Sequence, residues 1–221
     1  MSSTACAAPG SEESATRSRV PKDGAAPAGT DLAGRSSAER MCVGIVGVGG
    51  LGMLATEQLA RAGFRRFVLV DPDTIEATNL NRLPGVTHRD LGMLKVQIGK
   101  RMIRTIASSL GCTAEVSAYP LDVYQSVEAQ RTLSRCDLIL ALTDNELSWT
   151  MALQLAMDSG REYLQAGTDI ALGADGSIVG LRAEVTGAEI GRFCPLCSGR
   201  LAHTQEGMSQ HKPSTPATCL M

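Results

Sequence analysis

The sequence predicts an α/β fold: a doubly wound, mostly parallel sheet with helices on both faces. Short aliphatic runs alternate with amphipathic segments, and a glycine-rich turn follows the first of these runs. The runs are continuously apolar, which is typical of strands buried on both faces. The 221 residues are enough for one sizeable domain and few for two, so we expect one core and one functional site.

Composition excludes several classes of protein. Charged residues are 20% of the chain and the formal net charge is −2, so neither a polybasic nucleic-acid-binding protein nor a fully disordered chain is expected. No apolar stretch approaches about 18 residues and the N-terminus lacks the pattern of a secretory signal. We therefore expect a cytoplasmic protein without a membrane segment. The 7 cysteines argue against a disulfide framework, because their number is odd and most are scattered.

Residues 1–40 are expected to be a disordered leader. They are rich in Ala, Ser, Gly and Pro, and hold too few large apolar side chains to offset the entropy of ordering them. A transit peptide is the alternative, although the acidic residues of this stretch are out of character for one. The folded domain is expected at 41–201, and the polar residues 202–221 are expected to form an irregular tail, which suggests a truncated end.

The first half of the domain is expected to hold two strands, a helix and a long connection. Strands are expected at 42–47 and 67–71, where the chain is aliphatic. The helix between them, at about 51–62, ends at Gly63. Residues 72–90 show no periodicity and exceed an ordinary connection in length, which favours a functional or mobile segment.

The second half continues the alternation. A long amphipathic helix is expected at 91–110, with Gly111 ending it. Strands are then expected at 113–118, 137–143, 163–166 and 177–185, with helices at 126–135 and 146–158.

The turn between the first strand and the first helix reads Gly-Val-Gly-Gly-Leu-Gly over residues 47–52. Glycines at this place let backbone N–H groups and a helix N-terminus approach a phosphate. Asp71 follows about 20 residues later, where a carboxylate can accept hydrogen bonds from ribose hydroxyls. Gly47, Gly49, Gly50 and Asp71 therefore predict an adenine-nucleotide site, the alternative being a tight turn without a ligand.

Two cations follow this turn. Arg82 lies in the long connection, within the run Asn79-Leu80-Asn81-Arg82, and Lys95 lies early in the next helix. The glycine turn lacks the Gly-Lys-Ser/Thr ending of a phosphate-binding NTPase loop, so a triphosphate needs cations from elsewhere. NAD needs none, which makes an NAD-dependent oxidoreductase the weaker alternative.

Asp144 and Asn145 follow another predicted strand, at the edge where open α/β sheets bind ligands. Asp144 is a candidate Mg²⁺ ligand. It is also a candidate N-cap for the helix that begins at Glu146, and the two roles are compatible.

Together these motifs resemble the ThiF/MoeB/HesA superfamily, the adenylyltransferases related to ubiquitin-activating enzymes. The resemblance covers roughly residues 41–200, implies a Rossmann-like domain, and is specific because several motifs occur in the same order. They are the glycine turn 47–52, the run Val70-Asp71-Pro72-Asp73, the run 79–82, Lys95, and the run 143–145.

The resemblance implies that Mg·ATP adenylylates the C-terminal glycine carboxylate of a ubiquitin-like or sulfur-carrier protein, in a homodimeric enzyme. It places Gly50 against the nucleotide and Asp71 on the ribose. Arg82, Lys95 and Asp144 are the expected catalytic residues. The phosphates would be bound by Asn79, Arg82 and Lys95, and Mg²⁺ by Asp144 with Asn145 beside it. A non-catalytic nucleotide-binding scaffold of the same fold is the alternative.

The cysteines leave two questions open. Cys194 and Cys197 have the spacing of half a structural zinc site, but the second pair that zinc-binding relatives carry is absent here. A site completed by His203, His211 or Cys219, and two plain thiols in a turn, both stay possible. For the thioester transfer of some relatives no strong candidate exists, since Cys42, Cys112 and Cys136 are interpreted as core thiols and Cys219, although in the right region, lies near the end of the sequence. The resemblance implies that a segment like 213–219 leads into a further helix and more of the sheet, and their absence from this sequence predicts exposed apolar surface.

Overall fold

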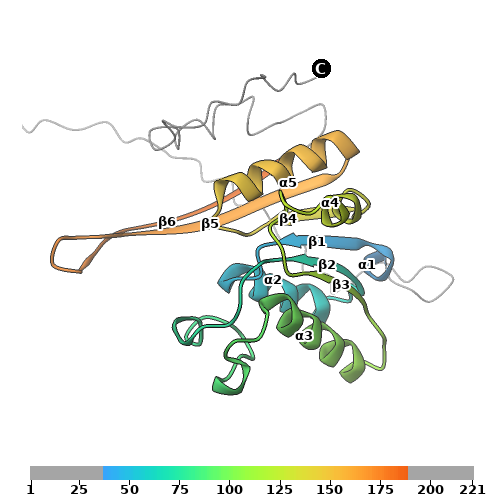
Figure 1. Cartoon of the computed structure of the whole chain (residues 1–221), viewed down its shortest axis with the longest axis horizontal. Coiled ribbons are helices and arrows are strands. Elements are labelled where there is room, and N and C mark those ends of the chain that lie inside the picture. The colour runs from blue at the N-terminus through green and yellow to red at the C-terminus, as the bar shows by residue number, and fades with distance from the viewer. Residues whose placement is uncertain (1–36, 189–221) are drawn as a thin grey trace, which may run out of the picture.

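The computed structural model describes residues 37–188, the side chain of Asp169 excepted. These residues form a six-stranded sheet in the order β3-β2-β1-β4-β5-β6 (Figure 1). Five strands are parallel, and β6 runs antiparallel to β5. The predicted Rossmann-like, mostly parallel sheet is therefore confirmed. The strands are β1 (Cys42–Val46), β2 (Arg66–Val70), β3 (Glu115–Tyr119), β4 (Leu138–Ala141), β5 (Glu162–Leu172) and β6 (Ile178–Ala188).

Helices cover both faces of the sheet, as the alternating pattern predicts (Figure 1). On one face Val43 and Ile45 of β1 pack with side chains of α2 and α3, and on the other Val46 packs with side chains of α4 and α5. Successive side chains of β1 thus enter two different cores, because a strand alternates its faces. The helices are α1 (Ser37–Arg40), α2 (Gly50–Arg61), α3 (Lys95–Ser109), α4 (Val127–Leu133) and α5 (Glu146–Ser159). For α1 the sequence predicts no regular structure.

Helix α3 begins at Lys95, later than the predicted start at residue 91. The four residues before it are not helical: Gly92 has a φ of +80°, and Leu94 is extended and forms an antiparallel bridge with Thr74. Leu91 and Leu94 fit the helical period, but backbone pairing with the preceding connection keeps them out of the helix. Lys95 consequently stands at the helix N-terminus.

The connection from β2 to α3 is ordered by its own polar side chains. It contains two 3₁₀ turns, Ala77–Asn79 and His88–Asp90, each closed by reciprocal side-chain bonds. Asp90 is buried, accepts hydrogen bonds from the backbone N–H and hydroxyl of Thr87, and pairs with Arg101 of α3 at 2.6 Å. These contacts tie the connection to the helix that follows it.

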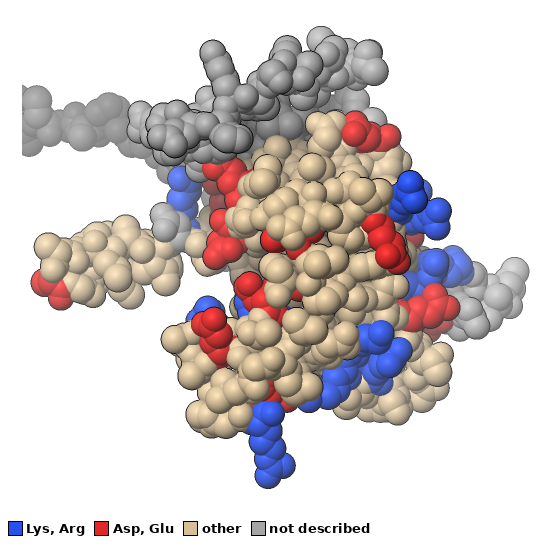
Figure 2. All heavy atoms as spheres, in the orientation of Figure 1, with Lys and Arg blue, Asp and Glu red and all other residues tan. Residues whose placement is uncertain are grey.

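Strands β5 and β6 extend beyond the sheet as a two-stranded arm (Figure 1). The sequence predicts only residues 163–166 as the first of these strands, because the rest carries glycine and polar residues. Figure 2 shows few charged side chains along the arm. Six large apolar side chains of the arm are 53–75% exposed: Ile170, Leu172, Ile178, Val179, Leu181 and Val185.

No helix within residues 37–188 is both long and apolar enough to cross a membrane. Most of the expected leader, the expected tail, and the Cys194–Cys197 pair with His203, His211 and Cys219 lie outside the described residues.

Candidate functional site

A cleft of about 450 Å³ opens where β1, β2 and β4 end at their carboxyl termini. This is the edge at which open α/β sheets bind ligands. Every site residue predicted within the described part of the chain lines it, except Asn79. The predicted residues that line the cleft are Gly47, Gly49, Gly50, Asp71, Arg82, Lys95, Asp144 and Asn145.

The glycine turn lines this cleft with backbone that carries no side chains. Gly47 has a φ of +90°, and a β-carbon there would lie 2.7 Å from the backbone nitrogen of Thr143. Helix α2 starts at Gly50 with no side-chain cap on Gly49, and the space beside Gly49 is open to at least 4 Å. Because the first N–H groups of a helix lack intrahelical partners, the turn presents donors suited to a phosphate.

Asp71 is hydrogen-bonded to the backbone of the glycine turn. Its Oδ2 accepts a hydrogen bond of 2.6 Å from the Val48 N–H, and its Oδ1 accepts one of 2.9 Å from the Asp73 N–H. Burial raises the pKa of this carboxyl, and the two backbone hydrogen bonds oppose that rise. The carboxylate is therefore fixed in place, and its remaining lone pairs are free to accept from ribose hydroxyls.

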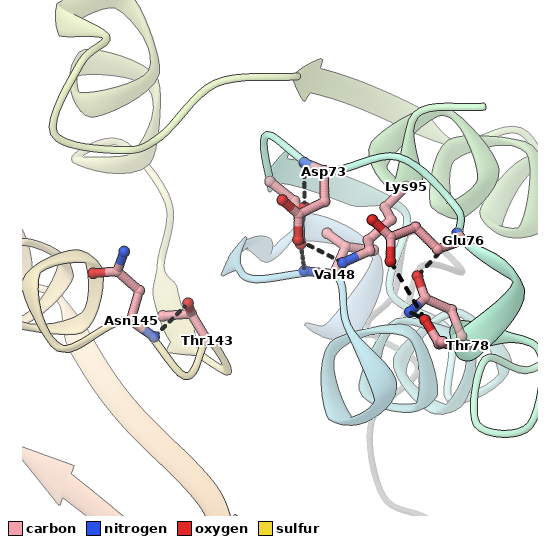
Figure 3. Close-up of polar contacts among 9 residues, drawn as sticks. Val48, Asp73, Glu76, Thr78, Lys95, Thr143 and Asn145 are labelled. Atoms are coloured by element: carbon pink, nitrogen blue, oxygen red, sulfur yellow. Dashed lines mark hydrogen bonds and ion pairs between the residues drawn. The ribbon is translucent and has the colours of Figure 1, made fainter. Parts of the chain in front are cut away.

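Lys95 enters the cleft paired with Asp73 (Figure 3). The Lys95 ammonium lies 2.6 Å from Oδ2 of Asp73, and the Lys95 N–H also donates to the Asp73 carbonyl at 2.9 Å. The Lys95 side chain is 12% exposed and that of Asp73 is 61% exposed. Sequence reasoning included Asp73 only as part of a motif, and the structure makes it the anionic partner of the candidate phosphate-binding lysine.

Arg82 reaches the cleft over the glycine turn. Its side-chain carbon Cδ lies 3.5 Å from the point that a β-carbon on Gly50 would occupy. One guanidinium nitrogen, Nη1, donates to the Thr78 carbonyl at 2.6 Å. The arginine is thereby held against α2 while the guanidinium keeps further N–H donors for an anion.

Asn79 lies in the same loop as Arg82 and is buried there. It is 6% exposed, and its side-chain oxygen accepts a hydrogen bond of 3.2 Å from the Glu76 N–H. The Arg82 N–H in turn donates to the Asn79 carbonyl at 3.1 Å. In this arrangement Asn79 shapes the loop that presents Arg82.

Asn145, and not Asp144, caps α5. The Asn145 side-chain oxygen accepts from the Ser148 N–H at 3.1 Å, while its own N–H donates to the Thr143 hydroxyl at 3.1 Å. The prediction that Asp144 caps this helix is thus wrong, because the helix begins at Glu146 and the residue directly before it is Asn145. Figure 3 shows Thr143 and Asn145 well apart from Asp73 and Lys95, on the other side of the view.

Asp144 is exposed and lines the cleft, and its carboxylate makes no hydrogen bond or ion pair with residues 37–188. Within the same residues, no three His, Cys, Asp or Glu side chains gather into a metal site. Mg²⁺ is commonly held by one or two carboxylates together with substrate phosphates and water, so a single carboxylate beside a phosphate site fits that ion.

Two further segments of the cleft wall were not identified in the sequence. Leu121, Asp122 and Val123 follow β3, and residues 166–168 lie within β5. Only their position in the sequence could have identified these segments, because segments that follow parallel strands meet at the same edge of a sheet.

Comparison with known proteins agrees with this geometry. The model of the ThiF family matches residues 25–212. Adenylyltransferase and sulfurtransferase UBA4 of Eremothecium gossypii is 30% identical over 66% of this chain and 31% of its own length. The sulfur carrier protein adenylyltransferase of Thermus thermophilus is 31% identical over 51% of this chain and 40% of its own. The tRNA threonylcarbamoyladenosine dehydratase of Bacillus subtilis is 34% identical over 42% and 36%. The chain thus spans about a third of the length of these relatives.

Among solved structures, E. coli MccB with ATP superposes with a TM-score of 0.58 at 22% identity. The match covers 81% of this chain and 51% of the MccB chain, and it supports the same fold.

Proposed function

Since the chain belongs to the ThiF family, we propose that it is an ATP-dependent adenylyltransferase. Its substrate is the C-terminal glycine carboxylate of a ubiquitin-like or sulfur-carrier protein, and its products are the acyl-adenylate and pyrophosphate. Relatives named as adenylyltransferases, one of them acting on a sulfur carrier protein, support this assignment.

The observation that carries the proposal is that two cations share a cleft with the glycine turn and Asp71. The turn and the carboxylate alone suit any adenine nucleotide, including NAD. Lys95 and Arg82 add positive charge where a triphosphate would lie, and a hydride-transfer site has no need of it.

The residues can support the reaction without a general base. The carrier carboxylate is already ionised near neutral pH and attacks the α-phosphorus, while the bond from that phosphorus to the bridging oxygen breaks. Pyrophosphate leaves with the electron pair of that bond. Catalysis then consists of positioning the two reactants and stabilising the charge that develops on the leaving oxygen.

Each cleft residue has a part in this scheme. The N–H groups of the glycine turn bind phosphate oxygens, and Asp71 orients the ribose. Lys95 and Arg82 stabilise the departing pyrophosphate, and nucleotide binding competes with the ion pair between Lys95 and Asp73. Asp144 would hold Mg²⁺, which neutralises phosphate charge when bound.

Three narrower proposals rest on the sequence and on the family resemblance. The working form is a homodimer, Cys194 and Cys197 bind zinc, and the protein acts in the cytoplasm. Light scattering, metal analysis of the Cys197→Ser variant, and localisation of the tagged chain test them in turn.

Calorimetry with Mg·ATP and, separately, with NAD⁺ tests the function without knowledge of the protein substrate. We expect Mg·ATP binding that Asp71→Ala abolishes and Arg82→Ala weakens, while Arg104→Ala on the outer face of α3 leaves it intact. Binding of NAD⁺ alone would overturn the proposal.

Exchange of labelled pyrophosphate into ATP, with a panel of carrier proteins that end in glycine, tests the chemical step. We expect exchange that Lys95→Ala and Arg82→Ala abolish. ATP binding without exchange for any carrier would favour the non-catalytic scaffold.

A further inference from the structure

Two cysteines that are 94 positions apart in the chain meet in the structure. The sulfur atoms of Cys42 and Cys136 lie 3.4 Å apart. Cys42 opens β1, and Cys136 immediately precedes Asp137, whose backbone N–H donates to the Cys42 carbonyl at 2.8 Å. The Cys42 N–H donates to the Asp137 carboxylate at 2.8 Å as well. Parallel pairing of β1 with β4 therefore holds the two thiols in contact.

The two thiols differ in accessibility. Cys136 is 0% exposed and packs in the core between the sheet and α4, whereas Cys42 is partly exposed at the end of its strand. A reagent from solvent therefore reaches Cys42 before it reaches Cys136, and the Cys136 thiol is in contact with the thiol that has reacted.

The two thiols also differ in acidity. The contact with Cys136 lowers the pKa of Cys42, and the nearby Arg66 guanidinium lowers it further, against burial and the charges of Asp137 and Glu115. The same contact, together with burial, raises the pKa of Cys136. Thiolate, the form that reacts with oxidants, thus forms on the accessible member of the pair.

The thiol pair is separate from the nucleotide cleft. Both sulfurs lie at the amino ends of β1 and β4, whereas the cleft lies at the carboxyl ends of the same strands. Oxidation of the pair would therefore link two central strands without touching a cleft residue.

We propose that Cys42 is a site of oxidation by hydroperoxides and that Cys136 converts the oxidised Cys42 into an intramolecular disulfide. In the first step the Cys42 sulfur attacks the terminal oxygen of the hydroperoxide. The O–O bond breaks, Cys42 becomes a sulfenic acid, and the remaining oxygen leaves as an alcohol, or as water from hydrogen peroxide. The proton released by the Cys42 thiol ends on that leaving oxygen.

In the second step the Cys136 sulfur attacks the Cys42 sulfur, and the S–O bond breaks. The hydroxide leaves with the Cys136 proton as water, and the S–S bond forms. Two electrons pass from the two sulfurs to the peroxide in total. The sulfurs need to close from 3.4 Å to about 2.05 Å, a movement within reach of side-chain rotation.

The full chain, reduced and then treated with hydrogen peroxide, tests this proposal by peptide mapping without reductant. We expect a linked peptide that joins Cys42 to Cys136, with the loss of two hydrogen masses and two free thiols. Cys112→Ser is the matched control, because this half-buried cysteine donates to the Leu110 carbonyl and not to another sulfur, and we expect it to give the same linked peptide at the same rate.

Variants separate the two steps. Cys136→Ser should accumulate Cys42 sulfenic acid that dimedone labels, and Cys42→Ser should give neither label nor linked peptide. Since Cys136 is buried, Cys136→Ala serves as a second variant if the serine disturbs folding, which circular dichroism would show. The proposal is overturned if Cys112 oxidises before Cys42 in the unmutated chain, or if Cys42 pairs with a cysteine other than Cys136.

Discussion

A β-carbon on Gly52 would lie 1.9 Å from the carbonyl oxygen of Gly47. The first helical turn of α2 is therefore folded directly against the residue that follows β1. The same tight turn is held by two backbone hydrogen bonds, from the Gly47 N–H to the Val70 carbonyl and from the Val48 N–H to the Asp71 carboxylate.

Gly52→Ala should lower the free energy of unfolding by about 1–3 kcal/mol, because the added methyl group meets backbone that cannot move aside. Gly49→Ala is the matched control, since nothing lies within 4 Å of a β-carbon there. Urea unfolding measures both variants. Equal losses for the two would contradict the geometry of the turn.

Asp71→Asn should abolish measurable Mg·ATP binding, because an amide nitrogen would face a backbone N–H that now donates to the carboxylate. Either orientation of the amide places its NH₂ against such a donor. Calorimetry measures the loss. Glu57→Gln on the outer surface of α2 is a control of equal charge change, and unchanged affinity in Asp71→Asn would remove Asp71 from the site.

Lys95→Gln should weaken Mg·ATP binding about tenfold or more, because a hydrogen bond to a charged group is worth about 1.5–3 kcal/mol. Asp73→Asn should have the opposite effect and strengthen Mg·ATP binding by a few-fold, since it frees Lys95 from its ion pair. Titration of both variants and of the double variant measures this. An effect of Asp73→Asn that persists in the absence of Lys95 would argue against the pairing.

The two buried carboxyls Asp71 and Asp90 should give stability profiles of opposite slope. Arg101 and the Thr87 contacts lower the pKa of Asp90, so its contribution is present above the unfolded value of 3.8 and is lost as the pH falls through the lower folded value. Burial raises the pKa of Asp71, so its ionisation costs stability as the pH rises from 3.8 through the higher folded value.

Urea unfolding at a series of acidic pH values, for the unmutated chain against Asp90→Asn and Asp71→Asn, measures the two slopes. The advantage of the unmutated chain over Asp90→Asn should grow with pH, and its advantage over Asp71→Asn should shrink. Parallel profiles would show that the two carboxyls share one environment.

Leu181→Thr combined with Val185→Thr should reduce aggregation, because both side chains are at least 66% exposed on the arm. The midpoint of thermal unfolding should change little, since neither side chain belongs to the core. Light scattering and calorimetry measure the two properties. The substitution Leu153→Thr in the core of α5 is the contrasting case and should lower the midpoint sharply.

Much of the fold was predictable from local patterns. The runs around Val43 and Val68 are aliphatic because both faces of those strands are buried, and Gly47 and Gly52 are glycines because backbone packs where a β-carbon would stand. The start of α3 was not predictable in this way. Leu91 and Leu94 have helical spacing, but Gly92 and Met93 between them hydrogen-bond to the backbone of Ile75, and Leu94 itself bridges Thr74.

The sequence by itself determined the alternation of elements, the glycine turn and the candidate nucleotide-binding residues of the cleft, because each depends on neighbours close along the chain. Only the tertiary structure decided which partners these residues take. The pairing of Lys95 with Asp73 and the contact of Cys42 with Cys136 are such cases. The register of parallel strands sets the last contact across 94 positions, and no local pattern encodes it.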